Sequence, residues 1–494
     1  MNLKSLAKDT AIYGLSSIVG RFLNYLLVPL YTNIITAESG GYGIVTNLYA
    51  YTALLLALLT FGMETTLFRF CNKEGEDEKM VYSTILRLVG GVGLAFLVLV
   101  AAFLHPIAEA LGYASHPEYI ACMAAIVALD AFQAIMFSRL RQQGRPIKFM
   151  SLKFAFIIPN VLLNLCIFLV LPRFFGRFPA AESFYVSMDY GVGLIFFVNL
   201  LCTFCVTFGF IRELKGITYG FDRTLARRLL AYSWPLLILS LVGIFNQVAD
   251  KILYPLVMPG SEGMVQLGIY GACVKIAMIM ALLTQAFRYA YEPIVFNGSR
   301  DRNSPETLAD GMKYFVVFTM LAFLAVVVYM PVLRHLIGRS YWEGLAVVPI
   351  VMMAEIFMGI YFNLSFWYKL SDQTHWGAIM SAAGAAVMVA VNVFGIPRWG
   401  YMACAWAGLA GYGTAMLLSW FIGQKKYPVR YDMRTILEFF ALALVIFFAY
   451  RALAHTSLAG NGSTLSAWPL MTIGTLMLAL YCLAILKVFK THES

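Results

Sequence analysis

The chain has 494 residues, of which 61% are hydrophobic and only 13% are charged, with a formal net charge of +10 and a mean hydropathy of +0.76. Soluble domains usually carry about 25% charged residues, so this composition excludes an ordinary soluble protein and predicts a membrane protein. The eight Cys are scattered, and the close pair Cys202 and Cys205 has no His or acidic neighbour, so we predict neither a metal site nor a bound cofactor.

Apolar stretches long enough to cross a bilayer recur along the whole chain, since a spanning helix needs about 20 apolar residues. They run at about 10–34, 43–66, 82–104, 119–138, 149–171, 184–211, 231–257, 266–292, 313–334, 343–368, 375–396, 401–422, 434–454 and 467–486. The first is too long for the apolar core of a signal peptide, so we interpret it as a span. The sequence therefore predicts an all-α integral membrane protein with about fourteen transmembrane helices.

The distribution of Lys and Arg predicts the orientation of these spans. With the N-terminus inside, the cytoplasmic segments hold about 25 of these residues, the outer segments about 6 and the spans about 5. The richest inner segments are 139–148, 212–228 and 425–434. This asymmetry explains the positive charge without a nucleic acid partner, places both termini in the cytoplasm and favours contact with acidic membrane lipids.

Short segments of the first half recur in the second half at a shift of about 219–228 residues, which indicates an internal repeat. Tyr42-Gly43 resembles Tyr270-Gly271, and the Ala-Leu-Leu-Thr segment at 57–60 recurs at 281–284. Six helices separate the matched segments, so the repeat is parallel. We predict a six-helix bundle at 1–212, a cytoplasmic linker at 213–230, a second bundle at 231–423, and two extra helices with a cytoplasmic tail at 424–494.

Four ionisable residues lie near the middle of predicted helices, where each costs roughly 2.5–3.5 kcal/mol to insert and needs a partner, water or a function. They are Arg21, Asp130, Lys275 and Glu355. The spacing of the two acids matches the repeat shift, so they occupy equivalent places in the two bundles. The two bases have no charged counterparts in the repeat, and we expect substrate specificity to depend on them.

Several short motifs in this order carry a family resemblance. They are Pro29-Leu30-Tyr31 before Tyr42-Gly43, Asp250-Lys251 before Gly268-Ile269-Tyr270-Gly271, Lys275, and Glu292-Pro293. Together they resemble the bacterial polysaccharide or O-antigen unit flippases of the multidrug/oligosaccharidyl-lipid/polysaccharide (MOP) exporter superfamily. The resemblance implies two helical bundles in the bacterial inner membrane. It implies that alternating access moves an undecaprenyl-diphosphate-linked oligosaccharide, an O-antigen, capsule or exopolysaccharide repeat, to the outer leaflet. A glycan polymerase and a chain-length regulator would be partners.

With a diphosphate substrate, we expect Arg21 and Lys275 to be phosphate ligands. They could instead neutralise Asp130 and Glu355 as structural ion pairs, or the two arrangements could be two states of one network. The resemblance makes Lys251 a further phosphate contact near the outer leaflet.

Two neighbouring pairs of charges are expected to behave differently. Adjacent helical residues do not face each other, so we expect Asp250 and Lys251 to bind different partners. Arg288 and Glu292 are four residues apart near an inner helix end, where a helix ion pair or a gating role is expected. Asn47 belongs to a set of amide and aromatic residues that could bind sugar but more often join helices.

The sequence has no Gly-rich phosphate loop of the ATPase type, so transport would depend on an H⁺ or Na⁺ gradient or on product removal. Asp130 or Glu355 would then carry the coupling ion. We predict that the chain is not an enzyme, because its outer loops are too short for a membrane-embedded polymerase or ligase. A cation-coupled multidrug exporter and a lipid II flippase of the same superfamily stay open as alternatives.

Overall fold

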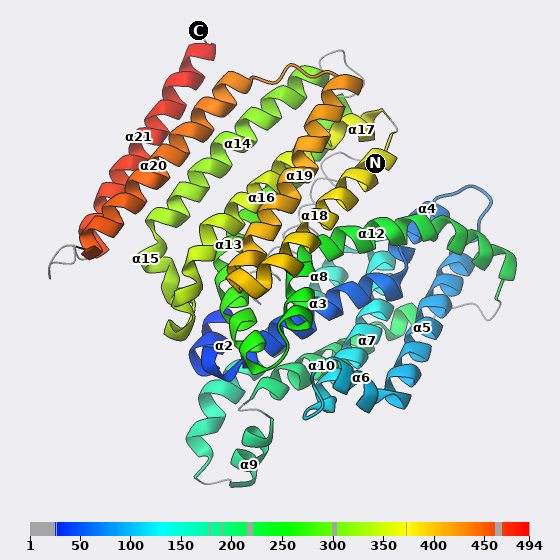
Figure 1. The fold of residues 1–494 in the computed structure, drawn as a ribbon. Helices are drawn as coiled ribbons and strands as arrows, with labels where there is room; N and C mark the ends of the chain where they lie inside the picture. Colours follow the sequence, from blue (N-terminus) through cyan, green and yellow to red (C-terminus); the bar gives the residue numbers. More distant parts are fainter. Residues whose placement is uncertain are drawn as a thin grey trace. The chain divides into compact units, whose positions relative to one another are not determined.

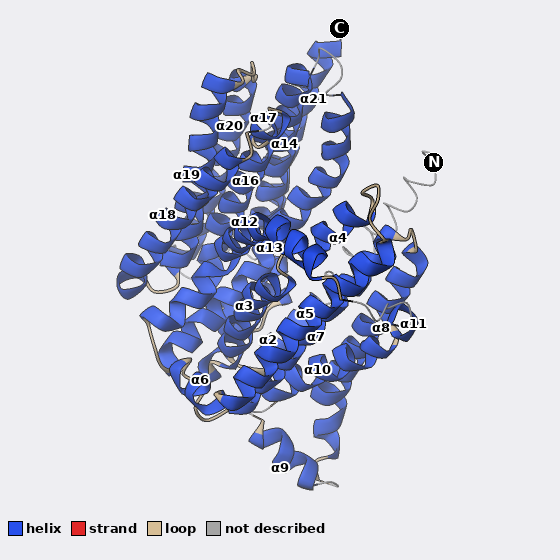
Figure 2. Cartoon of the chain, turned by 90° about the vertical axis from the view of Figure 1, so that its right-hand side faces the viewer, coloured by secondary structure: helices blue, strands red, loops and turns tan. Residues whose placement is uncertain are grey.

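A computed structural model describes residues 25, 27–176, 179–188, 191–214, 221–298, 304–371, 373–459 and 467–493. Within these ranges the chain consists of helices joined by turns, and no strand is present (Figure 2). Helices satisfy their backbone hydrogen bonds internally, which a segment surrounded by lipid requires. The predicted all-α fold is confirmed.

Twelve helices in the described part of the chain are long and apolar enough to cross a membrane. They are Gly41–Cys71, Glu78–Ala102, Pro117–Gln142, Pro146–Phe174, Arg223–Val257, Ser261–Glu292, Pro305–Val328, Arg339–Leu370, His375–Trp399, Met402–Lys426, Met433–Ala454 and Trp468–Lys487. Each overlaps one predicted span.

The other two predicted spans are a bent pair of helices and a segment that is described only in part. The predicted span at 184–211 is a bent pair, α9 (Pro179–Ser187) and α10 (Val192–Phe208), which would raise the number of spans to 13. The predicted first span at 10–34 lies mostly outside the described residues, and α2 (Leu27–Ile34) is its described part. The total of fourteen therefore stays a prediction.

The chain packs as two compact units, Met1–Gly271 and Ala272–Ser494. The first unit contains the elements up to the start of α13 (Figure 1). Besides α2, α9 and α10, they are α3 (Gly41–Thr60), α4 (Met63–Cys71), α5 (Glu78–Ala102), α6 (Leu104–Ala110), α7 (Pro117–Gln142), α8 (Pro146–Leu165), η2 (Cys166–Val170), η3 (Leu171–Phe174), α11 (Ile211–Leu214), α12 (Arg223–Val257) and the start of α13 (Ser261–Gly298). Its core is formed by fully buried apolar side chains such as Leu67, Ile85, Ile135 and Phe210.

This packing boundary lies beyond the predicted linker at 213–230, whose residues from Arg223 onward already belong to α12. The seventh predicted span therefore packs in one unit with the described parts of the first six. The division into two six-helix bundles is drawn from the sequence repeat, and it stays a prediction, because repeat and packing boundaries need not coincide.

Glycines allow α3 and the start of α13 to cross in close contact inside the first unit. A Cβ atom on Gly43 would lie 1.9 Å from the carbonyl oxygen of Met264, and one on Gly271 would lie 2.5 Å from Oγ1 of Thr46. Any side chain there would force the two helices apart. The two Tyr-Gly motifs that indicate the repeat thus meet at one helix crossing, which gives them a packing role.

The second unit contains the rest of α13 and the elements that follow it. They are α14 (Ser304–Val328), α15 (Met330–Leu333), η4 (Arg334–Leu336), η5 (Arg339–Ala346), α16 (Val347–Leu364), α17 (Phe366–Leu370), α18 (His375–Trp399), α19 (Met402–Lys426), α20 (Met433–Ala459) and α21 (Ala467–Glu493). Glycines also bring α18 and α19 together, since a Cβ on Gly384 would lie 2.7 Å from the carbonyl oxygen of Gly411.

The last two helices, α20 and α21, lie beside α14 (Figure 1). The Tyr450 hydroxyl donates to the carbonyl of Val328 at 3.0 Å, and the Tyr481 hydroxyl donates to the carbonyl of Val317 at 3.3 Å. Val328 is in the last turn of α14, where carbonyls lack a partner in their own helix. The predicted extra helices are thus joined to α14 by hydrogen bonds to its backbone.

Candidate functional site

The predicted site residues are distributed over four described helices, except for Arg21, which lies outside the described residues. Asp130 lies on α7, Lys251 on α12, Glu355 on α16, and Lys275, Arg288 and Glu292 on α13. Asp130, Lys275 and Glu355 each lie near the middle of a helix that is long and apolar enough to span a membrane, and each is half-buried.

Asp130 lies on α7, in the first unit. Among the residues that the structure describes, no ion pair or hydrogen bond engages its carboxylate, although Lys153 of α8 acts on it electrostatically. Lys153 is placed with its ammonium 4.1 Å from the centre of the Phe137 ring. We did not single out Lys153 from the sequence, although its position inside an apolar stretch was a sufficient signal.

Beyond Asp130 on α7, polar side chains form hydrogen bonds between three helices of the first unit. One turn further on, Nε2 of Gln133 donates to the Thr203 carbonyl at 2.8 Å and to Oγ1 of Thr207 at 2.9 Å. On the same helix α10, Nδ2 of Asn199 donates to the Tyr49 hydroxyl of α3 at 2.6 Å. These hydrogen bonds join α3, α7 and α10 and satisfy the polar side chains, whereas the carboxylate of Asp130 has no such bond among the described residues.

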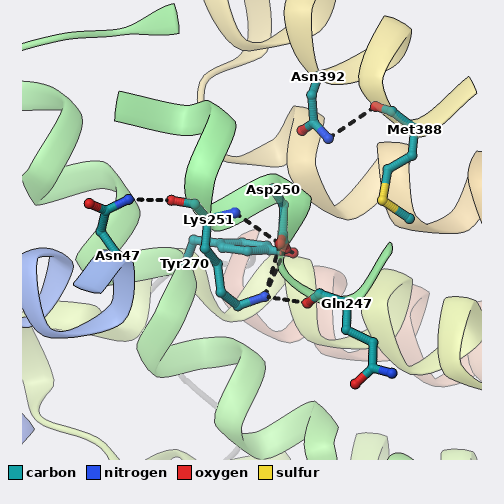
Figure 3. A network of polar contacts seen from close by, with 7 residues as sticks. All are labelled: Asn47, Gln247, Asp250, Lys251, Tyr270, Met388 and Asn392. Carbon is teal, nitrogen blue, oxygen red and sulfur yellow. Dashed lines mark hydrogen bonds and ion pairs between the residues drawn. The ribbon is translucent and has the colours of Figure 1, made fainter. Parts of the chain in front are cut away.

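Asp250 and Lys251 form an ion pair with each other, so our expectation of different partners was wrong (Figure 3). The Lys251 ammonium lies 2.9 and 3.1 Å from the two Asp250 oxygens and donates to the Gln247 carbonyl at 3.3 Å. The Tyr270 hydroxyl of α13 donates to the second Asp250 oxygen at 2.6 Å. The four-carbon lysine side chain is long enough to turn back along its own helix, which helical geometry at Cβ does not reveal.

Asn47 satisfies a backbone carbonyl that a proline leaves without a donor. In α12, Pro255 stands four residues after Lys251 and has no N–H, so the Lys251 carbonyl loses its helical partner. Nδ2 of Asn47 on α3 donates to this carbonyl at 2.8 Å (Figure 3). Oδ1 of Asn47 accepts from the Tyr113 hydroxyl at 2.7 Å. Asn47 therefore joins helices, which is the commoner of the two roles considered for it.

The expected ion pair at the end of α13 is present, with Arg288 and Glu292 3.7 Å apart. The Arg288 guanidinium also lies 4.0 Å from the centre of the Phe362 ring, and the Lys369 ammonium lies 4.5 Å from the same centre. Glu292 acts electrostatically on Lys369 as well. Lys369 was not singled out from the sequence, because its contact depends on α16 and α17 packing against α13.

Basic residues of the turn between α7 and α8 are neutralised by acids from other helices of the first unit. The ion pairs are Arg139–Glu78, Arg141–Glu64, Arg145–Glu213 and Lys148–Glu213. Arg139 and Glu213 are each 7% exposed, so the pairing offsets the cost of burying their charges. These residues predicted the orientation, and they also fasten helix ends together.

Comparison with known families identifies the chain. The sequence profile described as "Polysaccharide biosynthesis protein" matches residues 6–291, which is more than half of the chain. The chain belongs to this family. No curated protein matches the sequence.

Solved structures show which fold this family member has. It is similar to the lipid II flippase MurJ in an inward closed conformation, with a TM-score of 0.72, 13% identity, and coverage of 97% of this chain and 99% of that one. It is also similar to an inward-facing multidrug resistance transporter of the MATE family and MOP superfamily, with a TM-score of 0.60, 14% identity, and coverage of 82% of this chain and 93% of that one. For the MATE multidrug transporter DinF-BH the TM-score is 0.59 and the identity 16%, with coverage of 87% of this chain and 97% of that one.

At these identities the likeness shows the fold alone. The polysaccharide biosynthesis family member described here thus has the fold of the MOP superfamily, and the resemblance drawn from the sequence motifs is confirmed at the level of family and fold.

The contact between Asn47 and Lys251 predicts a specific thermodynamic coupling in this family member. Asn47→Ala should cost about 1–3 kcal/mol of stability, because a buried carbonyl and the Tyr113 hydroxyl both lose a partner. Pro255→Ala restores a backbone N–H four residues after Lys251, so Asn47→Ala should cost about 1 kcal/mol less in that background. Thermal unfolding of the purified protein measures both costs.

Asn72→Ala is the matched control, since the Asn72 amide is exposed and donates to the Phe68 carbonyl of its own helix. Equal costs of Asn47→Ala in the two backgrounds would show that the carbonyl freed by Pro255 is not what Asn47 stabilises.

Proposed function

We propose that this protein moves undecaprenyl-diphosphate-linked oligosaccharide units, such as O-antigen, capsule or exopolysaccharide repeats, from the inner to the outer leaflet of the bacterial inner membrane. Membership of the polysaccharide biosynthesis family and the MOP fold support a role in moving a glycan precursor. Both termini would be cytoplasmic, as the distribution of Lys and Arg indicates. A glycan polymerase and a chain-length regulator would act on the delivered product.

The observation that carries this proposal is Lys275, a half-buried cation near the middle of a 32-residue span. A diphosphate crossing a low-dielectric region needs fixed positive charge, which an ammonium supplies as a point charge and a guanidinium as a bidentate fork. Arg21 and Lys275 are therefore the proposed phosphate ligands. Alternating access would present them to one side of the membrane at a time.

Lys251 has a conditional part in this mechanism. Its ammonium is held by both oxygens of Asp250, so a phosphate could bind it only by displacing that carboxylate. The Tyr270 hydroxyl would keep Asp250 hydrogen-bonded after such an exchange. We propose Lys251 as a late contact near the outer leaflet, used when Asp250 is released.

The alternatives within the superfamily carry different cargo. A lipid II flippase would also need cations for a diphosphate, so the ionisable residues do not separate it from a flippase for surface glycans. A cation-coupled multidrug exporter is less compatible with this chain, since a cationic drug would meet the positive charge of Lys275. Glycan export and drug resistance, measured in the same strains, separate these functions.

Removing the proposed phosphate ligands should abolish delivery of the glycan precursor. In a strain that depends on this protein, we expect Arg21→Ala and Lys275→Ala each to reduce polymerised surface glycan about tenfold or more, since charge-assisted hydrogen bonds are worth about 1.5–3 kcal/mol. Immunoblotting for the glycan and for the protein measures export and expression. Lys275→Arg, which keeps the charge, should retain part of the export.

Arg398→Ala is the matched control, because Arg398 is exposed and its guanidinium donates to Phe394 of its own helix. Normal glycan in both alanine variants at normal expression would refute the assignment of phosphate ligands. Loss of drug resistance with intact glycan would instead support the exporter.

Asp130 and Glu355 are the proposed coupling or gating acids, with H⁺ or Na⁺ as the ion, and Arg288 with Glu292 is a proposed gating pair. Asp130 carries the clearest case, because its carboxylate lies in mid-span with no hydrogen bond or ion pair among the described residues.

We expect Asp130→Asn to leave folding intact and to make export insensitive to an uncoupler that lowers wild-type export. Lys153→Met tests how the charge of Lys153 affects Asp130. If the uncoupler lowers export by Asp130→Asn as much as it lowers wild-type export, Asp130 does not carry the coupling ion.

A further inference from the structure

Two arginines converge on one tryptophan in the segment that joins α14 to α16. The Arg334 guanidinium lies 4.3 Å from the centre of the Trp342 ring, and the Arg339 guanidinium lies 5.8 Å from the same centre. Arg334 is half-buried and Arg339 is exposed. Cations within about 6 Å of an indole centre are attracted by its π electrons, so the ring holds both side chains in one place.

Trp342 is itself fixed by the short helical turns around it. Its indole N–H donates to the carbonyls of Arg334 at 2.9 Å and Ile337 at 3.2 Å. The ring of His335 packs edge-on against the indole, with 5.3 Å between ring centres. The indole therefore closes η4 onto η5, and the two guanidinium groups are presented by an ordered turn.

The positive charge at this turn is not neutralised by the part of the chain that the structure describes. No carboxylate lies within ion-pair distance of either guanidinium there, and the buried Nε of Arg334 has no hydrogen-bond partner. The nearest acid in sequence, the exposed Glu343, acts electrostatically on Tyr401 and Cys273. The arginines between α7 and α8 differ in this respect, since acids from other helices pair with them.

The location adds to the contrast. In the predicted orientation this turn is on the outer side, where segments hold only about 6 of the 36 Lys and Arg residues. Two of these few residues share one indole. Both guanidinium groups lie over the same indole, and a guanidinium fork matches the oxygens of a phosphate.

We propose that Arg334 and Arg339, ordered by Trp342, form a binding site for a phosphate-bearing lipid head group at the outer surface. The occupant is either the diphosphate of the delivered lipid or the phosphate of an acidic phospholipid, since the chemistry of recognition is the same. The first of these sources rests on the proposed function. A second anion site at the outer surface would compete with Lys275 for the diphosphate and favour its release outward.

Pyrophosphate binding to the purified full-length protein tests the site without requiring transport. The titrations use isothermal calorimetry in a maltoside detergent, and all variants carry Arg21→Ala and Lys275→Ala so that the two proposed phosphate ligands of the transport site do not contribute. Adding Arg334→Ala and Arg339→Ala should weaken pyrophosphate binding about tenfold or more, whereas Arg398→Ala should not change it. Arg334→Lys with Arg339→Lys keeps the charge but loses the bidentate fork, and should give an intermediate affinity.

Vesicles distinguish the two sources of phosphate. Reconstitution into phosphatidylcholine with added phosphatidylglycerol should suppress pyrophosphate binding if a phospholipid is the occupant, and should leave it intact if the diphosphate is. Equal pyrophosphate binding with and without the two arginines, together with no effect of phosphatidylglycerol, would overturn the proposal. Glycan export is measured separately, so failure of this site and failure of the proposed function give different results.

Discussion

The cost of placing charge and unpaired backbone groups in a low-dielectric layer is the constraint on which the rest of this structure depends. Most polar groups of the described spans meet it by pairing. Gln133 and Asn199 bond across α7, α3 and α10, and Lys251 is held by Asp250. The carboxylate of Asp130 differs from them, because it has no bonded partner among the described residues, and this makes it the candidate site for an ion or a proton.

The same constraint explains how proline, asparagine and glycine together join helices. Pro255 frees a carbonyl within α12, and Asn47 of α3 donates to it, so a break in one helix becomes a bond to another. Gly43 and Gly271 allow α3 and α13 to approach closely beside this bond. Because the hydrophobic effect does not drive helices together inside lipid, close packing and buried hydrogen bonds supply the stability. The Tyr270 hydroxyl, one residue from Gly271, adds the contact to Asp250.

Hydropathy and helical spacing predicted those features that depend on one helix at a time. The twelve apolar helices, the mid-helix positions of Asp130, Lys275 and Glu355, and the Arg288–Glu292 pair all follow from counting along one axis. Features that depend on two helices, or on the path of a long side chain, were missed. Lys153 acts on Asp130 from another helix, and the Asp250–Lys251 pair needs a side chain that turns back. Arg334 meets Trp342 only after an irregular turn of the chain.

Direct observation of lipid movement tests the central claim of a flippase for diphosphate-linked glycans. The purified full-length protein would be reconstituted into liposomes containing a fluorescent undecaprenyl-diphosphate-linked oligosaccharide, and dithionite would quench the label exposed on the outside. The account predicts that label from the inner leaflet becomes accessible over time, at a rate lowered by Lys275→Ala. Inner-leaflet label that stays protected as it does in protein-free liposomes, while the same vesicles transport a cationic dye, would contradict it.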